Sequence, residues 1–160
     1  APVEGNIYFA VVDKMIFIKF GNYEYSSLLL DGQFPNYHKV IPENQPNSFS
    51  VDKKELESAL KRMAILIDKK VARIIFKLQS GVLTLISPES DLGNADEEIP
   101  CQYDGAEVTM ALNYISIEEP LKVIGTERIN FEFSESSKPI TIKSNPESDY
   151  FHIVMPMNLD

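Results

Sequence analysis

The sequence holds one cysteine, no long apolar run and no visible leader. Cys101 alone cannot form an intramolecular disulfide, which is typical of proteins from a reducing compartment. No apolar run approaches the roughly 18 residues that a membrane-spanning helix needs. The chain does not open with a basic segment followed by an apolar one, so no signal peptide is visible. We therefore expect a cytoplasmic protein with no membrane partner.

Motifs that carry catalysis or bind cofactors are also lacking. There is no glycine-rich phosphate loop, no HExxH and no Cys/His spacing of a metal site. His38 and His152 lie far apart without companions for a catalytic triad, and Cys101 is interpreted as a small core residue. The acidic stretch from Glu89 to Glu98 is interpreted as a solvated loop, with calcium binding as the alternative. We predict a binding or scaffold role, with no enzyme activity, no cofactor and no metal site.

Basic residues are outnumbered by acidic ones, 15 to 24, and the formal net charge is -9. This balance argues against a surface that is basic throughout, but it leaves room for one basic face. The content of hydrophobic residues, 44%, is ordinary for a globular protein. A length of 160 residues allows one domain, or one domain plus a fragment.

The first part of the chain predicts strands without a helix. β-Branched and aromatic residues are dense in 7–12, 15–20 and about 23–30, which indicates a hairpin and a third strand. Three strands alone make a poor independent domain, so we expect them to end a larger one. Residues 31–47 hold one glycine and three prolines, which predicts an extended connector.

Residues 47–160 predict the order strand, helix and three strands, twice. In the first unit, a strand near 47–51 precedes an amphipathic helix over about 53–67. Asp52 resembles its N-cap, and Glu55 follows three residues later, as in a capping box. The further strands of this unit are expected at about 72–79, 82–87 and 97–103.

The second unit begins with a strand over 106–112 and a shorter helix. Ser116 is the predicted cap, with Glu119 three residues on, and the helix is expected to end near Ile124. Pro120 should kink this helix unless it falls in the first turn. Strands are expected at about 128–133, 138–144 and 150–157. Two helices and about eight strands fit an α+β domain with both helices on one face of a continuous antiparallel sheet.

Basic residues gather on the first helix. Residues 52–70 carry a net charge of +2, while the rest of the chain carries -11. Lys54 and Lys61 project opposite the apolar stripe, and Arg62 lies on its flank. One interpretation is a solvated helix face. The other is a surface that faces phosphates without reading sequence.

Two segments that lie far apart in the sequence point to one family. The first is Leu30-Asp31-Gly32-Gln33-Phe34-Pro35-Asn36-Tyr37-His38-Lys39-Val40-Ile41-Pro42, and the second is Val154-Met155-Pro156-Met157-Asn158-Leu159. They resemble the inter-domain segment and the C-terminal strand and tail of the bacterial DNA polymerase III beta subunit, or beta sliding clamp. Shorter similarities lie between them, at residues 62–66, 97–99 and 105–113. The resemblance covers nearly the whole chain in one register.

The resemblance implies a DNA-clamp (processivity) fold. Residues 47–160 would be the third clamp domain, and residues 1–43 the closing strands of the second domain with the inter-domain connector. The chain would then be a C-terminal fragment of a longer protein. Family members form head-to-tail homodimeric rings around duplex DNA and tether DNA polymerase, the clamp loader and repair proteins through short hydrophobic peptides. This implies a non-catalytic DNA replication processivity factor in the bacterial cytoplasm, associated with the nucleoid during replication.

The family's functional positions carry over by motif. The partner-peptide groove is assigned to Pro35, Val40, Met155, Pro156, Met157, Asn158 and Leu159. The DNA-facing side chains are assigned to Lys54, Lys61 and Arg62.

Three positions depart from the family pattern. Asn158 stands where the family commonly has arginine, which leaves a charged contact to a peptide open. Ser137 falls near a position that is often apolar, and Pro120 interrupts an otherwise helical segment. The alternative function is a small-ligand-binding or enzymatic α+β domain with a cleft in the sheet. That alternative needs a catalytic cluster, and the sequence shows none.

Overall fold

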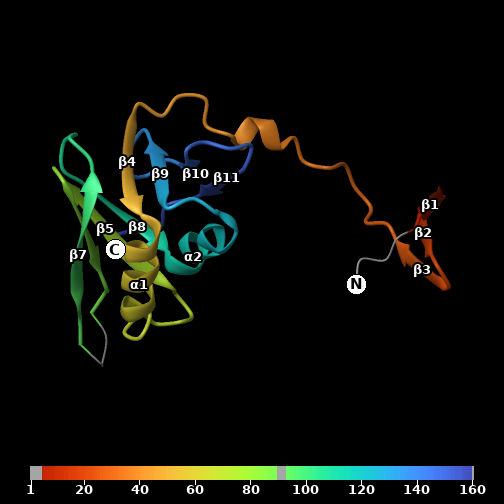
Figure 1. The fold of residues 1–160 in the computed structure, drawn as a ribbon, viewed down its shortest axis with the longest axis horizontal. Helices are drawn as coiled ribbons and strands as arrows, with labels where there is room; N and C mark the ends of the chain where they lie inside the picture. Colours follow the sequence, from red (N-terminus) through yellow and green to blue (C-terminus); the bar gives the residue numbers. More distant parts are fainter. Residues whose placement is uncertain (1–4, 90–92, 160) are drawn as a thin grey trace. The chain divides into compact units, whose positions relative to one another are not determined.

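The computed structural model describes residues 5–89 and 93–159 (Figure 1). The described residues divide into two compact units, one that ends at His38 and one that starts at Lys39. Within these residues, no helix is both long and apolar enough to cross a membrane. The domain ranges 1–43 and 47–160, which come from the family resemblance, stay a prediction.

The first unit is a three-stranded antiparallel sheet in the order β1-β2-β3. Its strands are β1 (Ile7–Val12), β2 (Met15–Phe20) and β3 (Tyr23–Leu28). Two-residue turns join them, and the positive φ angles of Asp13 and Gly21, 53° and 54°, give these turns the twist that tight hairpins need. The hairpin and the third strand are therefore confirmed, with the third strand two residues shorter than expected.

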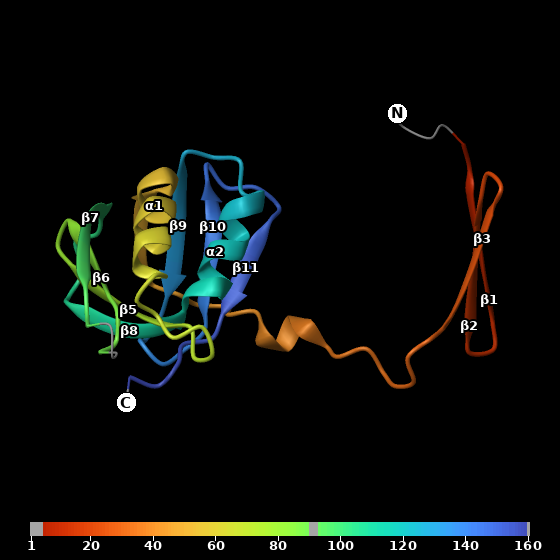
Figure 2. The same ribbon diagram turned by 90° about the horizontal axis from the view of Figure 1, so that it is seen from below.

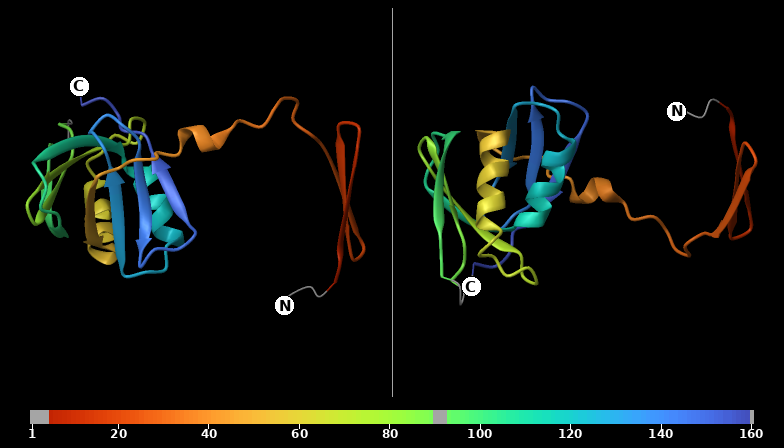
Figure 3. Two further views of the ribbon diagram at one scale, coloured as in Figure 1. Left: turned by 90° about the horizontal axis from the view of Figure 1, so that it is seen from above. Right: turned by 60° about the horizontal axis from the view of Figure 1, so that its bottom comes forward.

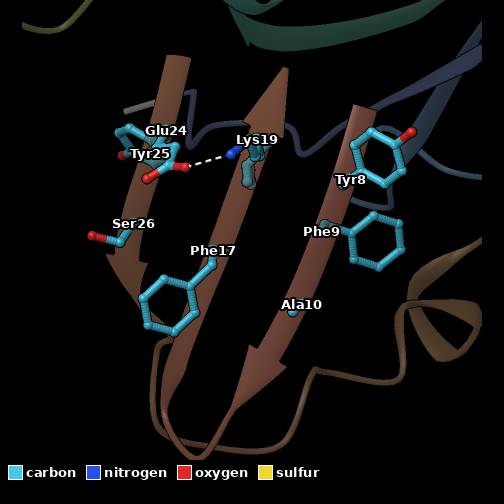
Figure 4. A pocket seen from close by; sticks show the side chains of 9 residues that line it. Tyr8, Phe9, Ala10, Phe17, Lys19, Glu24, Tyr25 and Ser26 are labelled. Carbon is cyan, nitrogen blue, oxygen red and sulfur yellow. Dashed lines mark hydrogen bonds and ion pairs between the residues drawn. The ribbon is translucent and has the colours of Figure 1, made fainter. Parts of the chain in front are cut away.

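Apolar side chains of this sheet are open to solvent. Figure 4 shows Tyr8 and Phe9 projecting from β1, with Phe17 on the neighbouring strand and an ion pair between Lys19 and Glu24 at 2.7 Å. Phe9 is 75% exposed. Exposure of this kind fits the expectation that the three strands belong to a larger domain, which stays a prediction.

The second unit has the predicted order of strand, helix and three strands, twice. Its first half consists of β4 (Asn47–Asp52), α1 (Lys53–Met63), β5 (Arg73–Gln79), β6 (Val82–Ile86) and β7 (Asp96–Gln102). Its second half consists of β8 (Val108–Asn113), α2 (Tyr114–Val123), β9 (Arg128–Phe133), β10 (Ile140–Asn145) and β11 (Phe151–Val154).

The eight strands form one antiparallel sheet in the order β11-β10-β9-β4-β7-β6-β5-β8. The sheet bends around the two helices, which lie side by side against it (Figures 2 and 3). The predicted α+β class, with two helices against one antiparallel sheet, is therefore confirmed.

The core lies between the helices and the sheet. Side chains alternate along the strands, so that Ile129, Phe131 and Phe133 of β9 are buried while their neighbours face outward. Phe49 stacks on Phe131 with ring centroids 4.6 Å apart. The helices contribute the apolar stripe that the sequence predicts, with Leu56, Leu60, Met63, Ile117 and Leu121 buried.

Helix α1 begins where the sequence predicts and ends earlier. The Asp52 carboxylate accepts a hydrogen bond of 3.0 Å from the amide of Glu55, so the predicted N-cap is confirmed. The helix ends at Met63 rather than near 67. The amides of Ile65 and Leu66 donate hydrogen bonds to the carbonyls of Arg62 and Met63, three residues earlier, which is a 3₁₀ rather than an α-helical pattern. Ile67 is nevertheless 5% exposed. The periodic pattern of buried apolar residues therefore continues to Ile67, although the helix has already ended at Met63.

Helix α2 has a different N-cap from the one that the sequence predicts. Its cap is Asn113, whose side chain accepts bonds from the amides of Ile115 and Ser116, so Ser116 lies inside the helix. Pro120 also lies inside rather than in the first turn, and the helix continues past it to Val123. The spacing of Ser116 and Glu119 matches that of a capping box. The helix nevertheless starts earlier, at Tyr114, because the last residue of β8, Asn113, is its N-cap.

Two irregular segments also differ from the sequence prediction. The expected extended connector contains a short 3₁₀ helix, η1 (Tyr37–Val40). β11 ends at Val154, before the predicted end at 157. Pro156 has no amide hydrogen to continue the strand pairing.

Candidate functional site

An apolar groove lies where the connector meets the end of β11. Residues 39–44 form one wall of this groove, and its other lining residues are Ser134, Lys138, Pro139, Ile153 and Met155. The groove brings together Val40 and Met155, which are far apart in the sequence and are 63% and 62% exposed. Exposed apolar side chains in a concave site suit an apolar anchor from a partner.

The tail leaves the groove after Met155 and reaches the edge strand β8. The amide of Met157 donates a hydrogen bond of 2.8 Å to the carbonyl of Ala111 in β8. The Arg73 guanidinium, at the start of β5, donates to the Asn158 carbonyl at 3.2 Å. Pro156 and Met157 are half-buried, while Leu159 is 49% exposed. The tail therefore follows the edge of the sheet, and its backbone is fixed there.

The predicted groove residues are thus not all in one place. Val40 and Met155 share the groove, whereas Pro156, Met157, Asn158 and Leu159 are absent from its described lining. Pro35 is exposed and belongs to the unit that ends at His38. Ile41, Ile153 and Pro139 also line the groove, and they are not among the residues predicted from the sequence. Ile41 stands inside the connector segment that carries the family resemblance, so that segment already held a signal for it.

The predicted DNA-facing side chains lie along the outer face of α1. Lys54 and Lys61 are exposed, and neither forms an ion pair within residues 5–89 and 93–159. Arg62 differs, because its Nε and Nη2 atoms both donate to the carboxylate of Glu97 in β7. Glu98 lines the same shallow hollow as Lys54 and Arg62. An acidic strand therefore flanks the basic helix face.

Glu97 is a partner of the site that sequence analysis missed. It follows Arg62 by 35 residues, and an ion pair between a helix and a strand that are distant in the sequence leaves no local pattern. Its carboxylate balances the charge of the Arg62 guanidinium. Lys54 and Lys61 are the cations of this face that lack such a partner among the described residues.

The remaining candidates for chemistry have ordinary surroundings. His38 stacks on Tyr37 with ring centroids 4.2 Å apart, and His152 is a half-buried residue of β11. Cys101 is buried in β7, and this burial raises the pKa of its thiol. Among the described residues, no group of three or more His, Cys, Asp or Glu side chains could hold a metal ion. Part of the acidic stretch Glu89–Glu98, at residues 90–92, lies outside the described residues.

Comparison with known proteins gives a consistent set of similarities. The family model for the DNA polymerase III beta subunit, C-terminal domain, matches residues 38–158. The beta sliding clamp of Treponema pallidum is 42% identical over 161 residues, which cover 98% of this chain and 43% of that protein. The beta sliding clamp of Pseudomonas aeruginosa is 31% identical and covers 87% of this chain and 38% of that protein. The chain thus spans about two fifths of the length of these relatives.

Solved structures of sliding clamps confirm the predicted DNA-clamp fold. A crystal structure of the DNA polymerase sliding clamp from Pseudomonas aeruginosa with ligand has a TM-score of 0.88 at 28% identity, over 99% of this chain and 43% of that one. A sliding clamp from the same organism bound to griselimycin has a TM-score of 0.85 at 29% identity, over 96% of this chain and 42% of that one.

Proposed function

This chain belongs to the DNA polymerase III beta subunit family, and we propose that it is the C-terminal part of a replication sliding clamp. The whole protein would encircle duplex DNA as a head-to-tail homodimeric ring, without sequence specificity. It would tether DNA polymerase, the clamp loader and repair proteins through short hydrophobic peptides, and it would catalyse nothing itself. It would act in the bacterial cytoplasm, at the nucleoid during replication. In this proposal, residues 1–43 close the second clamp domain and residues 47–160 form the third.

The observation that carries the proposal is the groove shared by Val40 and Met155. Its lining is largely apolar, and three lysine and glutamate side chains, Lys39, Lys138 and Glu43, lie along it. A short peptide with one apolar anchor would bury that anchor and keep its own polar ends in water. The Asn158 side chain replaces the charge that the family commonly has, so affinity here would depend mainly on apolar contact.

The methionines provide a direct test of peptide binding. The chain has five of them, and only Met155 and Met157 lie in the tail. We expect griselimycin, added to the chain with labelled methionine methyl groups, to shift the signals of Met155 and Met157. Met63 and Met110 are 2% and 1% exposed in the core and serve as internal controls.

The same titration can refute the peptide site. An unmoved Met155 signal at saturating griselimycin would remove the groove from the proposal. An unmoved Met157 signal alone would limit binding to the groove, whose described lining does not include Met157. Equal shifts at the core methyl groups would indicate a general change of the fold rather than binding at the tail. The variant Val40→Asp should weaken binding, because it places a charge on the opposite wall of the groove.

The proposed DNA-facing surface is supported by Lys54 and Lys61 of α1, which are exposed and form no ion pair within the described part of the chain. In the full-length protein, Lys54→Glu and Lys61→Glu should weaken retention on DNA. Each should also lower the salt dependence of binding, because fewer counterions are released. Lys77→Glu is the matched control, since Lys77 lies on β5 and pairs with Glu107 at 3.4 Å. An unchanged salt dependence in both α1 variants would show that these lysines do not face DNA.

A further inference from the structure

Gln45 makes two side-chain hydrogen bonds at the point where the connector enters β4. Its Nε2 atom donates to the Pro139 carbonyl at 2.7 Å. Its Oε1 atom accepts from the Thr141 hydroxyl at 2.6 Å. Gln45 is half-buried and Thr141 is 4% exposed, so both bonds are largely shielded from water. The side-chain amide of Gln45 therefore donates one hydrogen bond and accepts another, both with residues of the segment from Pro139 to Thr141.

The two partners of Gln45 belong to the other walls of the groove. Pro139 is itself a lining residue, in the segment between β9 and β10. Thr141 pairs with Ile153 across β10 and β11, and Ile153 also lines the groove. The connector wall, residues 39–44, ends immediately before Gln45. Gln45 thus joins the connector wall to both walls that face it, although it is not a lining residue itself.

The connector has few other attachments at this point. Among the described residues, no main-chain hydrogen bond ties residues 41–46 to the sheet. Pro42 and Pro46 have no amide hydrogen with which to form one. The next attachment is Asn47, whose side chain donates to the Ser134 carbonyl at 2.9 Å. The position of the connector wall therefore depends on side-chain bonds, and Gln45 provides the two nearest to the lining residues.

We propose that Gln45 is a positioning residue that sets the separation of Val40 and Met155 across the groove. This inference rests on the proposed function, because the groove matters for partners only if it binds peptides. The amide holds the connector against β10, so the groove keeps its width before a peptide arrives. A preformed groove binds more tightly, because less ordering is required on binding.

The variant Gln45→Met removes both bonds and keeps a side chain of similar length. We expect its affinity for griselimycin to fall about five- to tenfold, the size expected for one neutral hydrogen bond or slightly more. The affinity is measured by calorimetry, well below the unfolding midpoint of each variant. A role in stability alone would lower that midpoint and leave the affinity of the folded molecules unchanged.

Matched variants separate the two bonds and the substitution itself. Thr141→Val removes only the bond to Oε1, and Gln45→Glu keeps that acceptor and loses the donor to Pro139. Thr141→Val should give a smaller loss than Gln45→Met and should add little in the Gln45→Met background. Gln45→Glu should lose at least as much as Gln45→Met, because a half-buried carboxylate would face the Pro139 carbonyl. Gln79→Met is the control, because Gln79 bonds to Glu107 at 2.8 Å, away from the groove residues, and should bind normally.

A second readout needs no ligand. In the chain without griselimycin, magnetisation transfer between the methyl groups of Val40 and Met155 reports their separation. We expect this transfer to weaken in Gln45→Met, and amide exchange in residues 39–44 to accelerate. If both measurements match the parent chain, or if affinity is unchanged, Gln45 does not position the groove. If the parent chain fails to bind griselimycin, the proposed function fails, while the ligand-free measurements still decide the role of Gln45.

Discussion

The amide of Met157 donates a hydrogen bond to the carbonyl of Ala111, and this bond attaches the tail to the edge strand β8. The same relationship exists in the first half of the domain, where the first strand β4 pairs with the last strand β7 at Val51 and Cys101. In each half, the first strand thus pairs with the last segment of that half: β4 pairs with β7, and β8 pairs with the tail. The tail therefore completes the second half of the sheet, in addition to any role it has in binding partners.

Replacing Met157 with proline should loosen the tail. Proline removes the amide hydrogen, and the bond to Ala111 is lost with it. We expect the free energy of unfolding to fall by about 1 kcal/mol, the typical net contribution of one hydrogen bond. Urea denaturation measures this change. Met157→Leu keeps both the amide and an apolar side chain, so equal losses in the two variants would show that the backbone bond contributes nothing.

If α1 faces the duplex as proposed, Glu97 should weaken the binding of DNA to the basic face of this helix. Its carboxylate accepts the hydrogen bonds of the Arg62 guanidinium that a DNA phosphate would otherwise accept. In the full-length protein, Glu97→Gln should steepen the salt dependence of DNA binding by up to about 0.9 in the logarithmic slope, the value for one added phosphate contact. Glu107→Gln, which removes the partner of Lys77, should leave the slope unchanged. A slope that stays the same in Glu97→Gln would show that Arg62 makes no phosphate contact.

Gly105 is required by the ring of Tyr103. A Cβ atom at position 105 would lie 2.6 Å from the Tyr103 hydroxyl oxygen, which itself donates to the Ala106 carbonyl at 2.6 Å. Gly105→Ala should therefore destabilise the domain by about 1–3 kcal/mol, as overpacking does. Thermal and urea denaturation measure the loss. In a Tyr103→Leu background the same substitution should cost less, and an equal cost there would contradict the steric explanation.

Local sequence patterns correctly predicted those elements that are determined by residues close together in the sequence. The alternation of apolar residues indicated β9 with its observed bounds, and the cap at Asp52 needed only the residues beside it. The end of α1 was placed too late because Ile67 is buried by the turn that follows the helix, which periodicity cannot distinguish from another helical turn. The cap of α2 was misplaced because Asn113 is the last residue of a strand as well as the cap.

The site was predictable only in part, for a related reason. Val40 and Met155 came from the family resemblance, and the structure brings them to one groove. Glu97 and Gln45 act through partners that are 35 and more than 90 residues away in the sequence. Their side chains have no local periodicity or motif, since the sheet topology alone makes them neighbours. Contacts of this kind are visible only once the strand order is known.

Cys101 should react slowly while the domain is folded. Its side chain is 9% exposed in β7, and burial raises the pKa of the thiol, although the charge of Arg128 opposes this shift. The thiolate is the reactive form, so a disulfide reagent at pH 8 should modify the folded chain at least about tenfold more slowly than the urea-unfolded chain. Equal rates in the two states would show that the thiol is accessible in the native fold.

The same shift predicts a loss of stability in alkali. The unfolded thiol ionises near its ordinary pKa of about 8.5, whereas the folded thiol keeps its proton to higher pH. The contribution of Cys101 to stability is therefore fully present below about pH 8.5 and declines as the pH rises through the folded value. Urea denaturation at pH 7 and pH 10 should show a larger decrease for the parent chain than for Cys101→Ala, which has no thiol to ionise. The two decreases would be equal if Cys101 ionised as readily in the folded state as in the unfolded one.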